Sequence, residues 1–262
     1  MSRFICGRYT LDLSRPLVMG ILNVTPDSFS DGGRHDTVAL ALAHARALLA
    51  EGADILDIGG ESTRPGAPFV SPEEELRRVL PVLRELVQLN VPLSLDTRRT
   101  SVMQAALAEG LVDLINDVSA LEDDGALPLL AAANVGICLM HKQGNPDTMQ
   151  QQPSYHSVVD EVGGYLARRV QVCLDAGIDR ARLLADPGFG FGKTLEHNLA
   201  LLRSLPQLEQ EAGVPLLVGL SRKSMLGAIT GESRADQRLG ASIAAALLSA
   251  QQGASVIRVH DV

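Results

Sequence analysis

Eight short apolar runs recur along the chain, and each of them ends in a polar or charged residue. The runs are Leu17–Asn23, Ala53–Asp57, Val91–Asp96, Leu114–Asp117, Val135–His141, Leu183–Asp186, Leu216–Ser221 and Ser255–His260. The last seven each follow a helical stretch that closes on Gly or Asn, residues that tolerate the positive φ of a helix stop. Those stops are Gly52, Asn90, Gly110, Asn134, Gly177, Gly213 and Gly253. Eight strands alternating with helices predict an α/β fold, a single (β/α)8 TIM barrel, whose functional groups gather at the C-terminal strand ends.

The length of the chain agrees with this fold. Its 262 residues suit one barrel of about 250 residues, and no linker marks a second domain, so residues 1–262 are expected to form one domain. Ahead of the first barrel strand, Phe4–Leu13 alternates and turns near Gly7, which predicts an N-terminal β-hairpin covering the bottom of the barrel. The sequence stops at Val262, directly after the eighth strand, so the final outer helix is expected to be missing.

Apolar residues spaced by about 3.6 positions predict the outer helices. They are expected over Thr37–Glu51, Thr100–Glu109, Tyr155–Ala176, Leu195–Glu211 and Ala235–Gln252. A further helix is expected to open on the capping box Ser71-Pro72-Glu73-Glu74, with Pro in the first helical position, and to run to about Leu89.

Composition narrows the class of function. The net charge is -8 and no cluster of Lys and Arg is present, which argues against a nucleic-acid or anionic-membrane surface. Cys6, Cys138 and Cys173 are widely spaced and form no CxxC pair, so they are expected to be buried, reduced thiols. No apolar stretch has the length of a membrane span and the N-terminus lacks a signal-peptide pattern, so a cytoplasmic protein is expected.

Two long loops rich in Gly, Pro and polar residues follow the first two barrel strands. Val24–Gly33 and Gly59–Ala67 both fall on the face where barrel enzymes bind substrate, and both can act as moving lids. The alternative is that they are solvated connectors. An exposed aromatic at Phe29 and an unpaired Arg64 argue against that alternative.

Polar residues at the strand ends predict a binding site for a flat heterocycle. Asp96, Asn116 and Asp186 end three strands, and Lys223 follows a fourth. Two inward carboxylates and an amide need partners, because burying charge alone is costly. A planar ligand with several N–H donors and a carbonyl would satisfy the whole set. The alternative is an internal layer of ion pairs.

Arg258 and His260 stand two residues apart on the last strand and therefore share a face. Such a pair suits an anion such as a phosphate. The alternative is an Arg paired with an inward Asp beside a His that is already hydrogen-bonded. Asn23 offers one neutral oxygen at the first strand end, which suits Mg²⁺ when substrate phosphates supply further ligands. An inward Asn that only hydrogen-bonds backbone is the alternative.

Two motifs are rejected as sites. Gly188–Thr194 looks like a phosphate loop, but Pro187 stands where the Walker pattern requires Gly, and the two Phe of this segment indicate a packing or ligand wall. Cys138 and His141 are three residues apart on a strand and face opposite ways, so they are not expected to bind a metal together.

The residues also carry a family resemblance. Asn23–Gly33 and Asp54–Gly66 resemble the two signature segments of the dihydropteroate synthases, and Ser221–Lys223 and Arg258–His260 are similar to that family's late motifs in the right order. The match spans nearly the whole chain, and two long signatures together are highly specific. The resemblance implies a transferase of folate biosynthesis that condenses 6-hydroxymethyl-7,8-dihydropterin diphosphate with para-aminobenzoate to give 7,8-dihydropteroate and diphosphate.

The resemblance also implies roles for individual residues. The pterin would be held by Asp96, Asn116, Met140, Asp186, Lys223 and Arg258. The diphosphate would lie on Asn23, Arg64, Arg258 and His260, with Mg²⁺ on Asn23. The para-aminobenzoate pocket, which sulfonamides occupy in this family, would be lined by Phe29, Thr63, Pro65, Phe191 and Ser221. The catalytic set would be Asp31, Arg64, Lys223 and Arg258.

Three rival functions remain at this point. A pterin-dependent methyltransferase would share the pterin pocket but needs neither diphosphate-binding cations nor the Thr63–Pro65 loop. A non-catalytic paralogue would bind a pterin or a partner protein and would not need intact lids. A barrel for an unrelated phosphorylated substrate would leave the strand-end Asp and Asn residues unexplained. As partners we expect only small-molecule substrates and a second copy of the chain, held by the apolar segment Ala235–Gln252.

Overall fold

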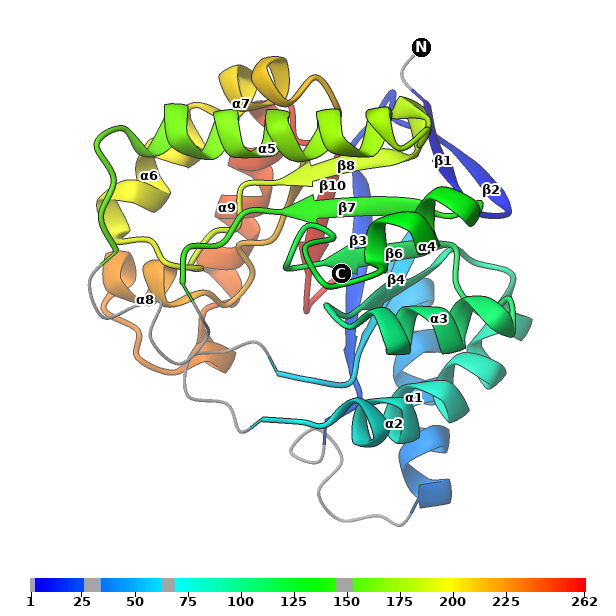
Figure 1. The fold of residues 1–262 in the computed structure, drawn as a ribbon. Coiled ribbons are helices and arrows are strands. Elements are labelled where there is room, and N and C mark those ends of the chain that lie inside the picture. Colours follow the sequence, from blue (N-terminus) through cyan, green and yellow to red (C-terminus); the bar gives the residue numbers. More distant parts are fainter. Residues whose placement is uncertain (1–2, 26–33, 63–68, 145–152) are drawn as a thin grey trace.

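The computed structural model describes residues 3–25, 34–62, 69–144 and 153–262. The barrel strands are β3 (Leu17–Asn23), β4 (Ile55–Gly59), β5 (Leu93–Asp96), β6 (Leu114–Asp117), β7 (Gly136–Met140), β8 (Leu183–Asp186), β9 (Leu217–Val218) and β10 (Val256–Val259). They form one parallel sheet in the order β8-β7-β6-β5-β4-β3-β10-β9. A parallel bridge between Ala185 and Leu216 joins the two edges. The sheet therefore closes into the predicted barrel, with helices around it (Figure 1).

The α-helices of the described residues surround this barrel. They are α1 (Arg34–Glu51), α2 (Pro72–Leu86), α3 (Thr100–Ala108), α4 (Ala126–Ala132), α5 (Val158–Asp175), α6 (Leu195–Arg203), α7 (Leu205–Ala212), α8 (Ser224–Thr230) and α9 (Leu239–Gln251). Short 3-10 turns cover η2 (Val87–Leu89), η3 (Arg180–Arg182) and η4 (Ala235–Gln237). The described residues after β10 contain no helix, and no helix of the described residues is long and apolar enough to cross a membrane.

Two helix predictions need correction, and two helices were missed. The single helix expected over Leu195–Glu211 divides at Ser204 into α6 and α7, with Pro206 in the first turn of α7. Proline lacks an N–H and clashes with the preceding turn, so it favours a new helix start over a helix interior. The helix expected from Ala235 begins at Leu239, after a 3-10 turn. Helices α4 and α8 were not predicted, because their seven residues are too few to show helical periodicity.

The predicted helix stops are confirmed at six of seven positions, which adopt positive φ. Asn134 is the exception: α4 ends in an extended backbone at Ala133, with φ -87° and ψ 159°. At the start of α2, the Ser71 hydroxyl accepts the N–H of Glu74 at 3.2 Å, which confirms half of the capping box. The carboxylate of Glu74 accepts instead from Arg77 and Arg78.

A hairpin of β1 (Arg3–Cys6) and β2 (Tyr9–Asp12) closes the amino-terminal end of the barrel. Phe4 is fully buried and packs among the first inward side chains of the strands. An ideal Cβ on Gly136 would lie 2.6 Å from the Phe4 ring, so the glycine leaves room for this ring inside the barrel. Arg8 then ties the hairpin to Asp113 through Nε at 2.8 Å and Nη2 at 2.8 Å. The predicted position of the hairpin is confirmed.

All three cysteines are free and buried, as predicted. Cys6 and Cys138 belong to the apolar cluster inside the barrel, and Cys173 belongs to the larger layer between strands and helices. Burial raises the pKa of Cys173 to about 11, which leaves this thiol protonated and unreactive at neutral pH. The amino-terminal half of the interior is therefore apolar, and the polar residues lie at the other end.

Candidate active site

The strand register brings several predicted residues into one row. Asn23 pairs with Gly59, Gly59 pairs with Asp96, and Asp96 pairs with Asn116 across four neighbouring strands. A Cβ placed on Gly59 would lie 3.7 Å from Asp96 Oδ2 and 3.8 Å from Asn23 Oδ1. The missing side chain of this glycine lets the two flanking oxygens approach the same space. The predicted gathering of strand-end groups is confirmed for these residues.

Arg258 from β10 lies at the centre of the polar interior. Its Nε donates to Asp57 Oδ2 at 2.6 Å, and its Nη2 donates to Asp96 Oδ2 at 2.8 Å. Asp57 also accepts from Ser94 Oγ at 2.5 Å and from Asn116 Nδ2 at 3.3 Å. Of the two interpretations of Arg258, the structure shows the one in which it pairs with inward aspartates.

Charge at this centre is unevenly matched. Burial alone would lower the pKa of Arg258, but the carboxylates of Asp57 and Asp96 raise it overall. Burial raises the pKa of Asp96 to about 7; Arg258 opposes the shift and Asp57 adds to it. One guanidinium thus faces two carboxylates, and a ligand that donates N–H groups would relieve the excess of acceptors.

Asp186 forms a second part of the mouth. Its Oδ1 accepts the N–H of Gly188 at 2.7 Å, and Met140 pairs with it from the neighbouring strand β7. Burial raises the pKa of Asp186, while the Gly188 N–H and then Lys223 act against that shift. Lys223 Nζ also lies 4.2 Å from the centroid of the Phe191 ring. Four predicted residues, from β7, β8 and the two loops that follow β8 and β9, are therefore brought together here.

Two further predicted residues, Ser221 and His260, meet near Arg258. The N–H of His260 donates to Ser221 Oγ at 3.2 Å, and its ring Nδ1 lies 3.1 Å from the same hydroxyl. Gly219 leaves room for the Arg258 stem, since a Cβ there would lie 3.7 Å from Arg258 Cβ. Ser221, three residues after β9, and His260, directly after β10, thus form one hydrogen-bonded pair.

The remaining predicted site residues, Phe29, Asp31, Thr63, Arg64 and Pro65, lie outside the described residues. Their assignments to the para-aminobenzoate pocket, the diphosphate site and catalysis stay predictions. They all belong to the loops that follow β3 and β4, the strands that carry Asn23 and Asp57.

Two residues of the centre were missed by the sequence reasoning. The second apolar run was expected to end at Asp57, but β4 continues to Gly59, so Asp57 lies inside the strand and is fully buried. Ser94 is hidden in the same way within the run that ends at Asp96. The available signal was the period of two: Ser94 shares a face with Asp96, and Asp57 shares one with Gly59.

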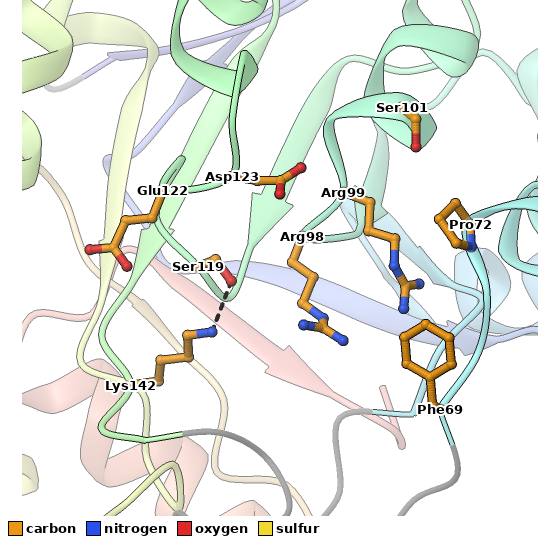
Figure 2. A pocket seen from close by; sticks show the side chains of 9 residues that line it. All are labelled: Phe69, Pro72, Arg98, Arg99, Ser101, Ser119, Glu122, Asp123 and Lys142. Atoms are coloured by element: carbon orange, nitrogen blue, oxygen red, sulfur yellow. Dashed lines mark hydrogen bonds between the residues drawn. The ribbon is translucent and has the colours of Figure 1, made fainter.

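A cavity of about 430 Å³ opens on the segments that follow β4, β5, β6 and β7. It is lined by Phe69, Pro72, Arg98, Arg99, Ser101, Ser119, Glu122, Asp123 and Lys142. Figure 2 shows these side chains bordering the opening, with the Lys142 ammonium directed at the Ser119 hydroxyl, 3.0 Å away. None of the predicted site residues in the described ranges lines this cavity. The signal that was overlooked is the Arg98-Arg99 pair directly after a strand end.

Comparisons with known proteins agree with the barrel and its polar mouth. Residues 19–260 match the family described as pterin binding enzyme. The dihydropteroate synthase of Neisseria meningitidis serogroup B is 59% identical over 268 residues, covering 100% of this chain and 94% of the relative. The Escherichia coli K12 dihydropteroate synthase is 50% identical, covering 97% of this chain and 89% of the relative.

Solved structures give the same result. A Xanthomonas albilineans dihydropteroate synthase with 4-aminobenzoic acid has a TM-score of 0.93 and 53% identity, covering 100% of this chain and 93% of that one. Another from the same organism, in complex with 7,8-dihydropteroate, has a TM-score of 0.87 and 48% identity, covering 100% and 93%. Fold and site together define a pterin-binding barrel enzyme. The chain belongs to the dihydropteroate synthase family.

Proposed function

We propose that this chain condenses 6-hydroxymethyl-7,8-dihydropterin diphosphate with para-aminobenzoate. The proposal rests on the residues at the mouth of the barrel. Asp96, Asn116 and Arg258 belong to one hydrogen-bonded group, and Asp186 lies near it. The relatives crystallised with 4-aminobenzoic acid and with 7,8-dihydropteroate support the second substrate and the product.

Recognition of the pterin follows from the donors and acceptors at the mouth. The aminopyrimidinone ring of a pterin carries N–H and NH2 donors next to a carbonyl. The carboxylates of Asp96 and Asp186 accept from such donors, Asn116 serves either way, and Lys223 donates to the carbonyl or a ring nitrogen. Each hydrogen bond to a charged group contributes about 1.5–3 kcal/mol, enough to orient the ring.

The chemistry breaks one bond and forms one. The C–O bond between the pterin methylene and the diphosphate breaks, and its electron pair leaves with the oxygen. The arylamine nitrogen bonds to the methylene carbon and loses a proton to solvent. Positive charge that develops on the methylene is stabilised by the buried carboxylates. Arg258, on β10, and His260, directly after it, would face the leaving group.

Mg²⁺ fits this proposal as a metal shared with the substrate. Within the described ranges no group of three or more His, Cys, Asp or Glu side chains could hold a metal alone. Asn23 Oδ1, which faces the space left by the missing Gly59 side chain, offers a neutral oxygen, and diphosphate oxygens would supply further ligands. When bound, Mg²⁺ would neutralise charge on the departing diphosphate.

The loops after β3 and β4 are assigned to the second substrate and to closure. Thr63, Pro65 and Phe29 would line the para-aminobenzoate pocket together with Phe191 and Ser221. Arg64 would bind the diphosphate, and Asp31 with Phe29 would exclude water that otherwise traps the methylene cation.

The test measures diphosphate released from the pterin substrate, with and without para-aminobenzoate and Mg²⁺. Release that requires all three supports the proposal. Tight binding of the pterin without any release would contradict it and would favour the non-catalytic paralogue. Methyl transfer to or from a reduced pterin, without diphosphate release, would favour the methyltransferase.

We also propose that the chain forms a homodimer through α9. Leu239, Ile243 and Leu247 recur every four residues on this helix and are 47%, 58% and 59% exposed. Large apolar side chains in a contiguous stripe favour burial against another surface. Ile243→Glu should convert the dimer to monomer in analytical ultracentrifugation, whereas Glu109→Lys, on an exposed helix end elsewhere, should not.

A cytoplasmic location is proposed as well, since all three buried cysteines are free.

A further inference from the structure

The rejected phosphate-loop motif has a different structural use. Gly188, Gly190 and Gly192 all adopt positive φ, at 69°, 79° and 66°. A Cβ on Gly188 would collide with the carbonyl oxygen of His141, and one on Gly192 with the carbonyl of Gln143. The glycines therefore let this loop press its backbone against the segment that leaves β7. The loop begins directly after β8, whose last residue is Asp186.

The side chain of Lys193, the lysine of the motif, points into the loop that carries it. Lys193 is 3% exposed, and its Nζ donates to Gly188 O at 2.9 Å and to Phe191 O at 3.1 Å. The third contact is His141 Nδ1, at 2.9 Å. An ammonium has three N–H donors, so these three neutral acceptors match it completely. The side chain bridges the beginning and the end of one tight turn.

The neutral state of His141 supports its role as the third acceptor. Burial lowers the pKa of His141 to about 3, with a further contribution from Lys193, so the ring is neutral and Nδ1 is free to accept. Burial also lowers the pKa of Lys193 to about 7, a shift that Asp186 opposes and Lys223 reinforces. The charged and titratable groups that face Lys193 thus come from β8, from the segment after β9 and from the segment after β7.

The two carbonyls that Lys193 holds belong to residues with contacts in the mouth. The N–H of Gly188 donates to Asp186 Oδ1, and the ring of Phe191 lies beneath Lys223 Nζ. Other bonds fix the far side of the loop: Asn198 Oδ1 accepts the Gly190 N–H at 2.9 Å. A shift of the turn would therefore move Gly188, the partner of Asp186, and Phe191, the partner of Lys223, together.

We propose that Lys193 is a positioning residue, which holds the turn from Gly188 to Phe191 so that Asp186 and Lys223 keep their places at the mouth. Its effect on turnover rests on the proposed condensation. Its effect on the position of Lys223 does not, and it is measured separately.

The structural test uses lysine labelled with carbon-13 at Cε. The chain has three lysines, Lys142, Lys193 and Lys223, so the spectrum contains three signals. The Lys223 signal should be shifted upfield by the Phe191 ring, and Phe191→Leu should remove that shift. Lys193→Met should move the Lys223 signal at least half of the way to its position in Phe191→Leu. An unchanged Lys223 signal in folded Lys193→Met overturns the proposal.

A matched control and a milder variant accompany this test. Arg182 is also a buried cation that donates to backbone carbonyls, those of Val135 and Leu130 at 2.8 Å each, but it precedes β8 at the other end of the barrel. Arg182→Met should lower the melting temperature without moving the Lys223 signal. Lys193→Gln keeps two N–H donors and should restore part of the upfield shift; it replaces Lys193→Met if that variant does not fold.

The kinetic test separates positioning from general loss of stability. Lys193→Met should lower kcat/KM for para-aminobenzoate about tenfold, the equivalent of one or two lost hydrogen bonds, well below its melting temperature. Arg182→Met should leave kcat/KM unchanged. Equal kinetics for both variants would overturn the catalytic part of the proposal. A wild-type protein without diphosphate release would instead refute the proposed condensation, and the Lys223 signal would still decide whether Lys193 positions the turn.

Discussion

The two ends of the barrel interior are built from the same eight strands and have opposite chemistry. At the amino-terminal end, Phe4 packs against apolar side chains of the strands. At the carboxyl-terminal end, the strands contribute Asp57, Asp96, Asn116 and Arg258, which bond to one another. The amino-terminal end buries apolar side chains, which stabilises the fold. The carboxyl-terminal end buries charged side chains, which can bind a ligand. Stability and function should therefore separate along the barrel axis.

The largest expected effect is on stability, at the amino-terminal end. Phe4→Ala removes a fully buried ring and leaves a cavity, so the free energy of unfolding should fall by about 3–5 kcal/mol. Urea unfolding measures this loss. Diphosphate release well below the unfolding midpoint should be unchanged, and exposed Thr10→Ala should alter stability by less than about 0.5 kcal/mol. A large loss of turnover in folded Phe4→Ala would break the separation of the two ends.

The next effect is on activity, at the carboxyl-terminal end. Asp57→Asn removes the charge that holds Arg258 Nε, and Asp96 alone then orients the guanidinium. The kcat/KM for the pterin substrate should fall about 100-fold, since a buried charge pair loses one partner. Steady-state diphosphate release gives the value. Wild-type kinetics in Asp57→Asn would show that Arg258 needs no support from β4.

A third prediction concerns pH, because buried titratable groups with displaced pKa values gather at the carboxyl-terminal end. The folded pKa of His141 is about 3, below its ordinary value of 6.5. Its contribution to stability is therefore complete above pH 6.5 and is lost as the pH falls toward 3, by at most about 1.4 kcal/mol per pH unit. His141→Asn keeps an acceptor for Lys193 but does not titrate. Urea unfolding at pH 7 and pH 5 should show a smaller acid loss for the variant; equal losses would contradict this assignment.

The smallest effect is expected from an ion pair outside the barrel. Arg15 pairs with Asp54 at 2.6 Å, but its side chain is 63% exposed. Exposed pairs contribute about 0–1 kcal/mol, because water screens them. Arg15→Ala should shift the unfolding free energy by no more than that amount and leave kcat/KM unchanged. A loss comparable to that in Phe4→Ala would show that this surface pair closes the barrel bottom.

Local sequence was sufficient for most elements and for the membership of the mouth. Gly52, Gly110 and Gly213 mark helix stops because glycine adopts positive φ without steric cost, and the structure has positive φ at all three. Asp96 and Asp186 were predicted because a carboxylate at the end of an apolar strand needs a partner. Asp57 was missed because its strand was expected to end there, whereas β4 continues to Gly59 and places Asp57 inside the barrel.

The sequence by itself determined the barrel, its order of strands and helices, and the residue types that meet at one end, because periodicity and turn chemistry act over a few residues. Only the tertiary structure decided which groups bond. Asp57 and Arg258 are separated by 201 positions and meet through strand register and barrel closure. Lys193 likewise does not serve the phosphate binding that its motif suggests. Its side chain is buried in its own loop, where the segment after β7 supplies His141 as an acceptor. Contacts between distant segments depend on how the strands close, and no local pattern encodes them.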